Sequence, residues 1–201
     1  MIKKDFDIPE VIIHLHKQIP LGSGLGGGSS NAAETLKMLD KMFNLFLDED
    51  LLAWYALKLG SDCPFFIYNK PLMASGRGEV FEEIKTDLAG KFIVVINPGF
   101  SVSTVEAFRF LQPGVPEISI GEIIENEPIE KWKETLRNDF EEIVLKKYPQ
   151  LTDIKNKLYG AGSIYVSLTG SGSGIYGIFN QAPDSIPAFP PEFLTWSGFL
   201  Q

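Results

Sequence analysis

The residues that could do chemistry begin in a glycine-rich run from Pro20 to Ala33, which contains five glycines. An alternating apolar segment precedes the run, and apolar residues recur at three- and four-residue steps after it. These patterns predict a strand at 10–17 and a helix at 30–45. Glycines let the backbone approach a ligand, and the first N–H groups of a helix lack intrahelical acceptors. The sequence therefore predicts an anion site, for which phosphate is the natural ligand.

Hydroxyl and amide side chains follow the glycines at Ser29, Ser30 and Asn31. These positions predict helix caps, whose side chains could also reach phosphate oxygens or the water shell of a metal. The residues predicted to bind phosphate are Pro20, Gly22, Ser23, Gly24, Leu25, Gly26, Gly27, Gly28, Ser29, Ser30 and Asn31.

Three other interpretations of the glycine-rich run fit it less well. A plain glycine turn closed by a Ser/Asn cap rarely needs this many glycines. A Walker A loop would end in Gly-Lys-Ser/Thr, which is missing here. Residues 22–27 do satisfy Gly-x-Gly-x-x-Gly, but a dinucleotide fold needs a second strand ending in an acidic residue about 20 residues further on. Here Asp48 is instead predicted to cap a second helical pattern at 51–59.

Length and charge narrow the class of protein. A chain of 201 residues makes one large or two small domains. The formal net charge of −8 argues against a nucleic-acid partner. No apolar run is long enough to span a bilayer, and the first residues do not resemble a secretory signal. The sequence thus predicts neither a nucleic-acid nor a membrane partner.

Cysteine and histidine usage predicts no protein-bound metal centre. The single cysteine, Cys63, allows no internal disulfide and fits a cytoplasmic location. His14 and His16 could form a zinc pair, but no third ligand accompanies them, and two polar positions on a half-exposed strand are the simpler interpretation.

The rest of the chain has the patterns of an α+β protein. Helices are predicted at 103–111, 120–127, 131–147 and 151–159. Strands are predicted at 66–68, 72–74, 91–97, 164–168 and 175–179, with an edge strand at 193–199 and a loop at 113–119.

Three segments together resemble the GHMP kinase superfamily over roughly residues 9–180. They are the glycine run, the segment Leu59–Phe66 and a second glycine-rich segment, Leu168–Gly174. The run Gly24–Ala33 looks like the form found in the 4-diphosphocytidyl-2-C-methyl-D-erythritol kinase branch. Gly60–Phe66 is similar to the Gly-Ala-Asp-x-Pro-Phe-Phe segment of that branch, with Ser61 where alanine is usual.

The resemblance implies an α+β fold with two halves. An incomplete N-terminal half like domain 2 of ribosomal protein S5 is expected at 1–88, and a ferredoxin-like half at 89–201. It also implies a kinase that uses ATP and Mg²⁺ to phosphorylate the 2-hydroxyl of 4-diphosphocytidyl-2-C-methyl-D-erythritol, in non-mevalonate isoprenoid (terpenoid) biosynthesis. The alternatives are another GHMP kinase for a small alcohol, or a non-catalytic nucleotide-binding fragment.

The resemblance also assigns roles to single residues. Asp62 looks like the catalytic aspartate, which would accept the proton of the attacking hydroxyl; the alternative is a turn residue before Pro64. Thr104 and Phe108 match positions that line the cytidine side of the substrate, although Phe108 could equally be a core aromatic. The remaining substrate residues implied are Thr169, Gly170, Ser171 and Gly172. Their segment, Thr169–Gly174, would close over the phosphates or the sugar-like end of the substrate, and it could also be a plain strand connection.

The family begins with an N-terminal segment that has no counterpart in this sequence. In the family, that segment carries a strand hairpin, a catalytic lysine and residues that bind the two ends of the substrate. Lys3, Lys4 and Lys17 do not stand in the lysine motif. We therefore expect a truncated form that is weakly active or inactive and that self-associates through an exposed sheet edge.

Overall fold

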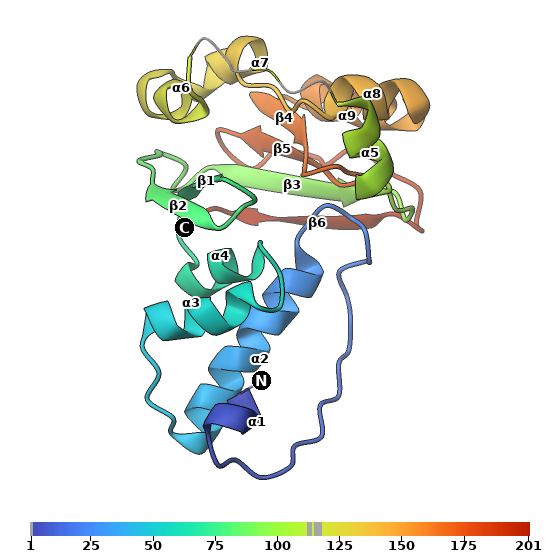
Figure 1. Cartoon of the computed structure of the whole chain (residues 1–201). Coiled ribbons are helices and arrows are strands. Elements are labelled where there is room, and N and C mark those ends of the chain that lie inside the picture. Colours follow the sequence, from blue (N-terminus) through green and yellow to red (C-terminus); the bar gives the residue numbers. More distant parts are fainter. Residues whose placement is uncertain (1, 112–113, 115–117) are drawn as a thin grey trace. The chain divides into compact units, whose positions relative to one another are not determined.

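The computed structural model describes residues 2–111, 114 and 118–201 (Figure 1). It divides into two compact units. The first comprises Met1–Ile19 and Gly26–Ile84, and the second comprises Pro20–Leu25 and Lys85–Gln201. Both helices and strands are present, which confirms the predicted α+β class.

The first unit is mainly helical. Its elements are α1 (Ile2–Asp5), α2 (Gly27–Phe43), α3 (Glu49–Leu57), α4 (Cys63–Tyr68) and the antiparallel pair β1 (Leu72–Ser75) and β2 (Val80–Glu83). Helix α2 buries Ala33 and Leu36 in a core that includes Ala56 of α3 and Ile67 of α4. Asp48 caps α3 as predicted, because its carboxylate accepts a hydrogen bond from Leu51 N–H at 2.8 Å.

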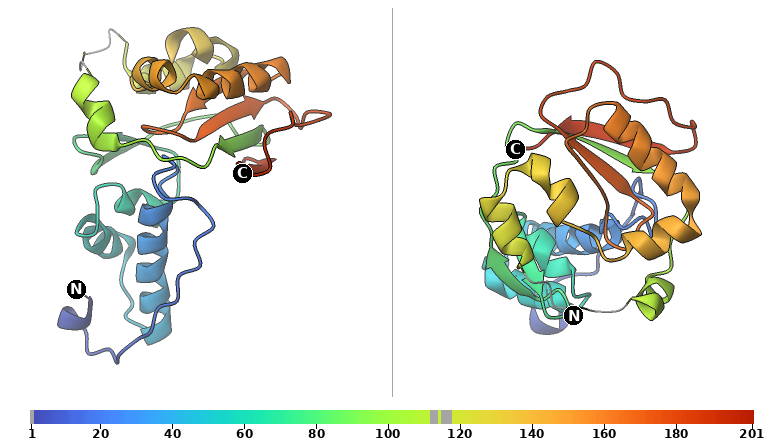
Figure 2. Two further views of the ribbon diagram at one scale, coloured as in Figure 1. Left: turned by 90° about the vertical axis from the view of Figure 1, so that its right-hand side faces the viewer. Right: turned by 90° about the horizontal axis from the view of Figure 1, so that it is seen from above.

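The second unit is a four-stranded antiparallel sheet with helices on one face (Figures 1 and 2). The strands are β3 (Phe92–Asn97), β4 (Tyr165–Leu168), β5 (Ile175–Phe179) and β6 (Leu194–Phe199), in the order β4-β5-β3-β6. The helical segments are α5 (Thr104–Phe110), α6 (Ile120–Asn126), η1 (Ile129–Lys131), α7 (Trp132–Thr135), α8 (Glu141–Lys147) and α9 (Pro149–Gly160).

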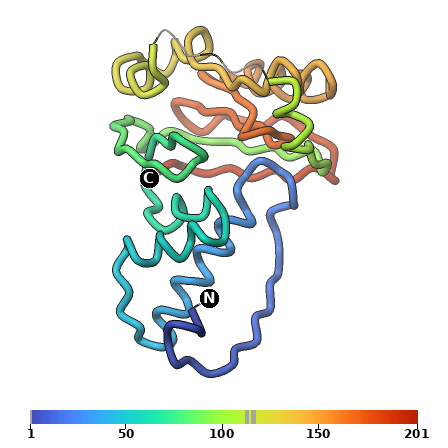
Figure 3. Tube along the Cα trace, viewed as in Figure 1, coloured from blue at the N-terminus to red at the C-terminus, as the bar shows by residue number. Residues whose placement is uncertain are grey.

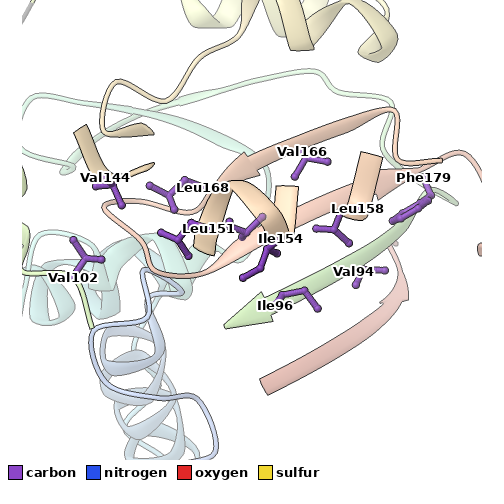
Figure 4. Close-up of a cluster of buried hydrophobic side chains, with 11 residues drawn as sticks. Val94, Ile96, Val102, Val144, Leu151, Ile154, Leu158, Val166, Leu168 and Phe179 are labelled. Carbon is purple, nitrogen blue, oxygen red and sulfur yellow. The ribbon is translucent and has the colours of Figure 1, made fainter. Parts of the chain in front are cut away.

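The core of this sheet lies under α9. Leu151, Ile154 and Leu158 of α9 pack against Val94 and Ile96 of β3 in one buried cluster (Figure 4). In the register, Val94 stands opposite Gly177 of β5 and Ser197 of β6. The predicted strands at 91–97, 164–168, 175–179 and the edge strand at 193–199 are confirmed, as are the helices at 103–111, 120–127 and 151–159.

A ferredoxin-like unit has a helix between its third and fourth strands, but residues 180–193 form a loop here. The sequence explains the loop, because Pro183, Pro187, Pro190 and Pro191 each lack the N–H that a helix interior needs.

The predicted strand at 10–17 is wrong. The segment runs extended beside α2 without pairing to any described strand (Figure 3). Ile12 and Ile13 are 87% and 62% exposed. Strand propensity alone does not make a strand, because an extended segment needs a neighbour for its N–H and C=O groups. His14 and His16, placed on that strand, are exposed.

Four further sequence expectations need correction. Helix α2 begins at Gly27 rather than at 30, and residues 66–68 belong to α4, with Pro64 in its first turn, rather than to a strand. The single helix predicted at 131–147 is interrupted at 136–140, and β2 was not predicted at all. The predicted loop at 113–119 falls largely outside the described residues.

Across the described part of the chain, no helix has both the length and the apolar character needed to cross a membrane.

Candidate functional site

The first part of the glycine run belongs to the second unit, where it packs backbone to backbone against the second glycine-rich segment. Gly24 has a φ of +75°, and a Cβ built on it would lie 2.1 Å from the Thr169 carbonyl oxygen. The Thr169 hydroxyl donates to Gly24 O at 2.9 Å, and Gly174 N–H donates to Ser23 O at 2.9 Å. Glycine is therefore required at 24 both for its positive φ and for this close approach.

The second glycine-rich segment forms a tight loop between β4 and β5. Thr169 N–H donates to Gly174 O at 2.9 Å, and Gly172 N–H donates to Thr169 O at 2.9 Å. Gly170 and Gly172 have φ values of +55° and +87°. The backbone of this segment does connect two strands, as one of the two interpretations expected. The segment also contacts Gly24 and Ser23, which a connection between two strands does not require.

Two of the predicted substrate residues meet at this loop. The hydroxyls of Thr104 and Ser171 lie 3.2 Å apart. Phe108, one turn further along α5, is 58% exposed, and its ring stands edge-on to Phe140 with centroids 5.0 Å apart. Phe108 is therefore not a core aromatic, and one side of its ring is accessible for stacking on a base.

The second part of the run opens α2 in the first unit. Gly26 is the N-cap residue with a φ of 64°, and no side chain caps the helix. The expected caps at Ser29, Ser30 and Asn31 are wrong, because these residues already lie inside the helix. The first intrahelical bond runs from Ser30 N–H to Gly26 O at 2.9 Å. The N–H groups of the preceding helical residues are thus available to a ligand.

Space around these glycines differs from one to the next. A Cβ on Gly26 would lie 2.7 Å from Phe66 Cζ, and one on Gly27 would lie 2.8 Å from Ile19 Cγ2. Gly28 has no atom within 4 Å of such a Cβ. Gly26 and Gly27 are thus explained by packing, whereas Gly28 faces open space beside the helix N-terminus.

Asp62 belongs to the same unit as this helix start and directly precedes Cys63. Burial raises the pKa of the Cys63 thiol, Ser29 of α2 lowers it, and the charge of the neighbouring Asp62 raises it further. Asp62 itself is exposed and stands at the N-cap of α4. Its carboxylate makes no cap hydrogen bond and accepts one from the Ser61 hydroxyl at 3.1 Å. A purely structural turn residue would be expected to cap α4.

Lys17 does not stand in the family's lysine motif, yet it lies against the start of α2. Its Nζ donates to Asn31 Oδ1 at 2.9 Å, which places a cation on the first turns of α2. Its position three residues before Pro20 was the available signal. Two further cations of the first unit are Lys70, paired with Glu83, and Arg77, in the turn between β1 and β2.

Family comparisons match both halves of the chain. The family model described as GHMP kinases N terminal domain matches residues 1–70, and the one described as GHMP kinases C terminal matches residues 122–189. A 4-diphosphocytidyl-2-C-methyl-D-erythritol kinase from Azobacteroides pseudotrichonymphae is 44% identical over 190 residues, which cover 94% of this chain and 71% of that protein. The chain belongs to this branch of the GHMP kinases.

Two more GHMP relatives agree with this assignment. The 4-diphosphocytidyl-2-C-methyl-D-erythritol kinase of Bacteroides fragilis strain YCH46 is 44% identical over 180 residues, covering 90% of this chain. A crystal structure of 4-(cytidine 5'-diphospho)-2C-methyl-D-erythritol kinase matches with a TM-score of 0.66 and 29% identity over 82% of this chain. The chain spans 65% of the Bacteroides fragilis protein and 60% of the crystallised chain.

The two glycine-rich segments lie at different places in this fold. The first supplies the turn before α2, and the second supplies the loop between β4 and β5. The described residues contain no group of three or more His, Cys, Asp or Glu side chains that could hold a metal ion.

Proposed function

We propose that this chain carries the phosphate-binding and substrate-binding parts of a kinase. The reaction would transfer the γ-phosphoryl group of ATP to the 2-hydroxyl of 4-diphosphocytidyl-2-C-methyl-D-erythritol, a step of non-mevalonate isoprenoid biosynthesis. The observation that carries the proposal is the start of α2, which glycines open and where no side chain caps the first N–H groups; Asp62, an exposed carboxylate, belongs to the same unit. The printed names of the relatives support the choice of substrate. A cytoplasmic location stays a prediction from the sequence.

The start of α2 would bind the phosphates of ATP. The N–H groups of Gly27, Gly28 and Ser29 precede the first intrahelical bond, and no acidic residue stands in the first turn. The helix dipole is positive at this end, so an anion is stabilised there without competition from a local carboxylate. Because phosphoryl transfer depends on positioning and charge stabilisation, a rigid set of donors is the main requirement.

Mg²⁺ fits this arrangement as an ion that arrives with ATP. It prefers oxygen ligands and commonly binds through substrate phosphates with few protein side chains. The hydroxyls of Ser29 and Ser30, both half-buried at the helix start, are the side-chain oxygens that could complete its shell. When bound, Mg²⁺ would neutralise charge on the phosphates.

Asp62 would accept the proton of the attacking hydroxyl or orient that hydroxyl. An exposed carboxylate that makes no cap hydrogen bond is suited to this task. Thr104, Ser171 and Phe108 would hold the cytidine side of the substrate, since the two hydroxyls converge and the ring has an accessible side. Thr169, Gly170 and Gly172 would shape the loop around it.

We also propose that this chain alone turns over slowly. Phosphoryl transfer needs a cation near the transferring group, and a single well-placed electrostatic donor is worth about 10²–10³ in rate. Lys70 is paired with Glu83, and the Lys17 amine donates to Asn31, so neither is ready-made for that role.

A coupled ADP-release assay tests the proposal. The chain, and a chimera carrying the part of the Bacteroides fragilis relative outside the match, would each receive ATP–Mg²⁺ with 4-diphosphocytidyl-2-C-methyl-D-erythritol, homoserine or mevalonate. We expect the chimera to act on the cytidyl substrate alone, and the chain to be slower.

Other results of the assay would favour one of the alternatives. Turnover of homoserine or mevalonate by the chimera would favour another GHMP activity. Nucleotide binding without turnover of any alcohol by the chimera would favour a non-catalytic fragment. Equal rates for chain and chimera would contradict the slow-turnover proposal and direct attention to Lys17, Lys70 and Arg77 as candidates for the cation.

A further inference from the structure

The interruption of the helix predicted at 131–147 brings one side chain against the second glycine-rich loop. Residues 136–140 leave helical geometry between α7 and α8, and Asn138 lies in this break, half-buried. The break takes Asn138 out of a helix, where its amide would compete with the backbone for hydrogen bonds.

Asn138 uses both ends of its amide. Its Nδ2 donates to Leu168 O at 2.9 Å and to Gly170 O at 2.8 Å. Its Oδ1 accepts a hydrogen bond from Phe140 N–H at 2.9 Å, at the start of α8. One side chain therefore holds two carbonyl groups of the loop and also orders the turn that leads into α8.

A carboxylate from the same turn holds the other side of the strand end. Glu141 Oε1 accepts from Leu168 N–H at 2.7 Å and from the Ser167 hydroxyl at 3.2 Å, and its other oxygen pairs with Lys155. The N–H and C=O of Leu168 are thus both bound by side chains from 138–141, so the end of β4 is fixed in rotation as well as position.

The carbonyls that Asn138 holds flank Thr169, whose hydroxyl donates to Gly24 O at 2.9 Å. Ser171, the next residue after Gly170, is the one that meets Thr104. Further along the loop, fully buried Asn97 donates to Ser173 Oγ at 3.2 Å. Asn138 therefore controls the part of the loop that carries the two side chains directed at Gly24 and Thr104.

We propose that Asn138 is a positioning residue for substrate binding. It holds the carbonyls of Leu168 and Gly170 so that Thr169 and Ser171 point to their partners before the substrate arrives. The inference rests on the proposed function, because it takes the loop to bind the cytidyl substrate. Its physical basis is preorganisation, in which donors and acceptors that are already fixed cost no ordering free energy upon binding.

The alternative is that Asn138 only caps α8. Asn138→Asp separates the two roles, because aspartate keeps an oxygen to accept from Phe140 N–H but loses the N–H groups that hold the loop. It also places a negative charge against two carbonyl oxygens. Asn138→Ala removes both roles. The matched control is Asn126→Asp, since Asn126 Nδ2 donates to a backbone carbonyl, Glu122 O, at 2.9 Å on exposed α6.

Two measurements on the whole chain distinguish a positioning role of Asn138 from a capping role. Hydrogen exchange of the ligand-free chain would follow two amides of the loop, that of Gly172, which donates to Thr169 O, and that of Gly174, which donates to Ser23 O. Calorimetric titration would measure the affinity for 4-diphosphocytidyl-2-C-methyl-D-erythritol. For Asn138→Asp we expect loop exchange to rise about tenfold or more, substrate affinity to fall about tenfold, and α8 exchange to stay as in the wild type. Asn126→Asp should change none of these.

The outcomes separate this inference from the proposed function. Unchanged loop exchange in Asn138→Asp, or a looser loop with unchanged substrate affinity, would overturn the positioning role. Loss of α8 protection in Asn138→Asp equal to that in Asn138→Ala would overturn it as well. A wild-type chain and a chimera that both fail to bind the cytidyl substrate would refute the proposed function, and the exchange data would then still decide whether Asn138 holds the loop.

Discussion

The Thr169 hydroxyl donates a hydrogen bond to the Gly24 carbonyl at 2.9 Å, across 145 residues of sequence. It joins the two glycine-rich segments of the second unit at the point where Gly24 has no room for a side chain. This close approach explains why glycine is needed at position 24, and the stability of the second unit should be sensitive to it.

The first prediction concerns Gly24→Ala. A Cβ there would lie 2.1 Å from Thr169 O, and the φ of +75° is unfavourable for alanine. The expected loss is about 3 kcal/mol or more in the free energy of unfolding, measured by chemical denaturation. Gly90→Ala is the matched control, because Gly90 has a φ of +77° and nothing within 4 Å of a Cβ. It should lose only about 1–2 kcal/mol. Equal losses for the two variants would mean that the approach to Thr169 is not tight.

The second prediction concerns Gly28→Ala, which tests the phosphate site without disturbing packing. Gly28 lies inside α2 with open space around it, so alanine should stabilise the fold by about 0.5–1 kcal/mol. The same methyl group would stand where phosphate must approach, and we expect ATP affinity in calorimetry to fall about tenfold. Gly160→Ala, at the end of α9 with open space, is the control and should leave ATP affinity unchanged. Wild-type affinity in Gly28→Ala would move the phosphate site elsewhere.

The third prediction concerns self-association through the exposed apolar segment. Ile12 and Ile13 are 87% and 62% exposed, on an extended segment that pairs with no described strand. Such a segment favours pairing with another chain. The double change Ile12→Lys and Ile13→Lys should lower the average mass in sedimentation at high protein concentration, with little effect on the unfolding midpoint. Val105→Lys is the control, since Val105 is 68% exposed on α5. A wild-type chain that stays monomeric at high concentration would contradict this prediction.

Much of the fold could be predicted because its signals are local. The buried run Phe92–Asn97 has to be a strand, and the Asp48 cap fixes the start of α3. The glycine run also predicted a helix start, since its chemistry depends on backbone N–H groups close to it in sequence. The first residue of α2 was predicted wrongly, because Gly26, in the left-handed conformation, is the N-cap residue and starts the helix earlier than a Ser or Asn cap would.

The wrong predictions concern segments whose structure depends on residues far away in the sequence. Residues 10–17 have strand propensity, but a strand also needs a neighbour that the sequence pattern cannot supply. The helical pattern of 131–147 continues through Asn138, and only the carbonyls of Leu168 and Gly170, about thirty residues away, show why the helix breaks there. The same limit explains why the sequence pointed to Asp62 through its family motif but did not point to Asn138.

The most direct test of the account is the rate of phosphoryl transfer in Asp62→Asn. It is measured with ATP–Mg²⁺ and 4-diphosphocytidyl-2-C-methyl-D-erythritol, in the chimera if the chain alone is too slow. An amide keeps the size of the side chain but cannot take a proton, so we predict a loss of about 10²-fold or more in kcat with ATP and substrate binding retained. Asp48→Asn, which removes the same charge and keeps a good cap on α3, should leave kcat unchanged. A near-wild-type kcat in Asp62→Asn would contradict the central claim and leave Asp62 as a turn residue before Pro64.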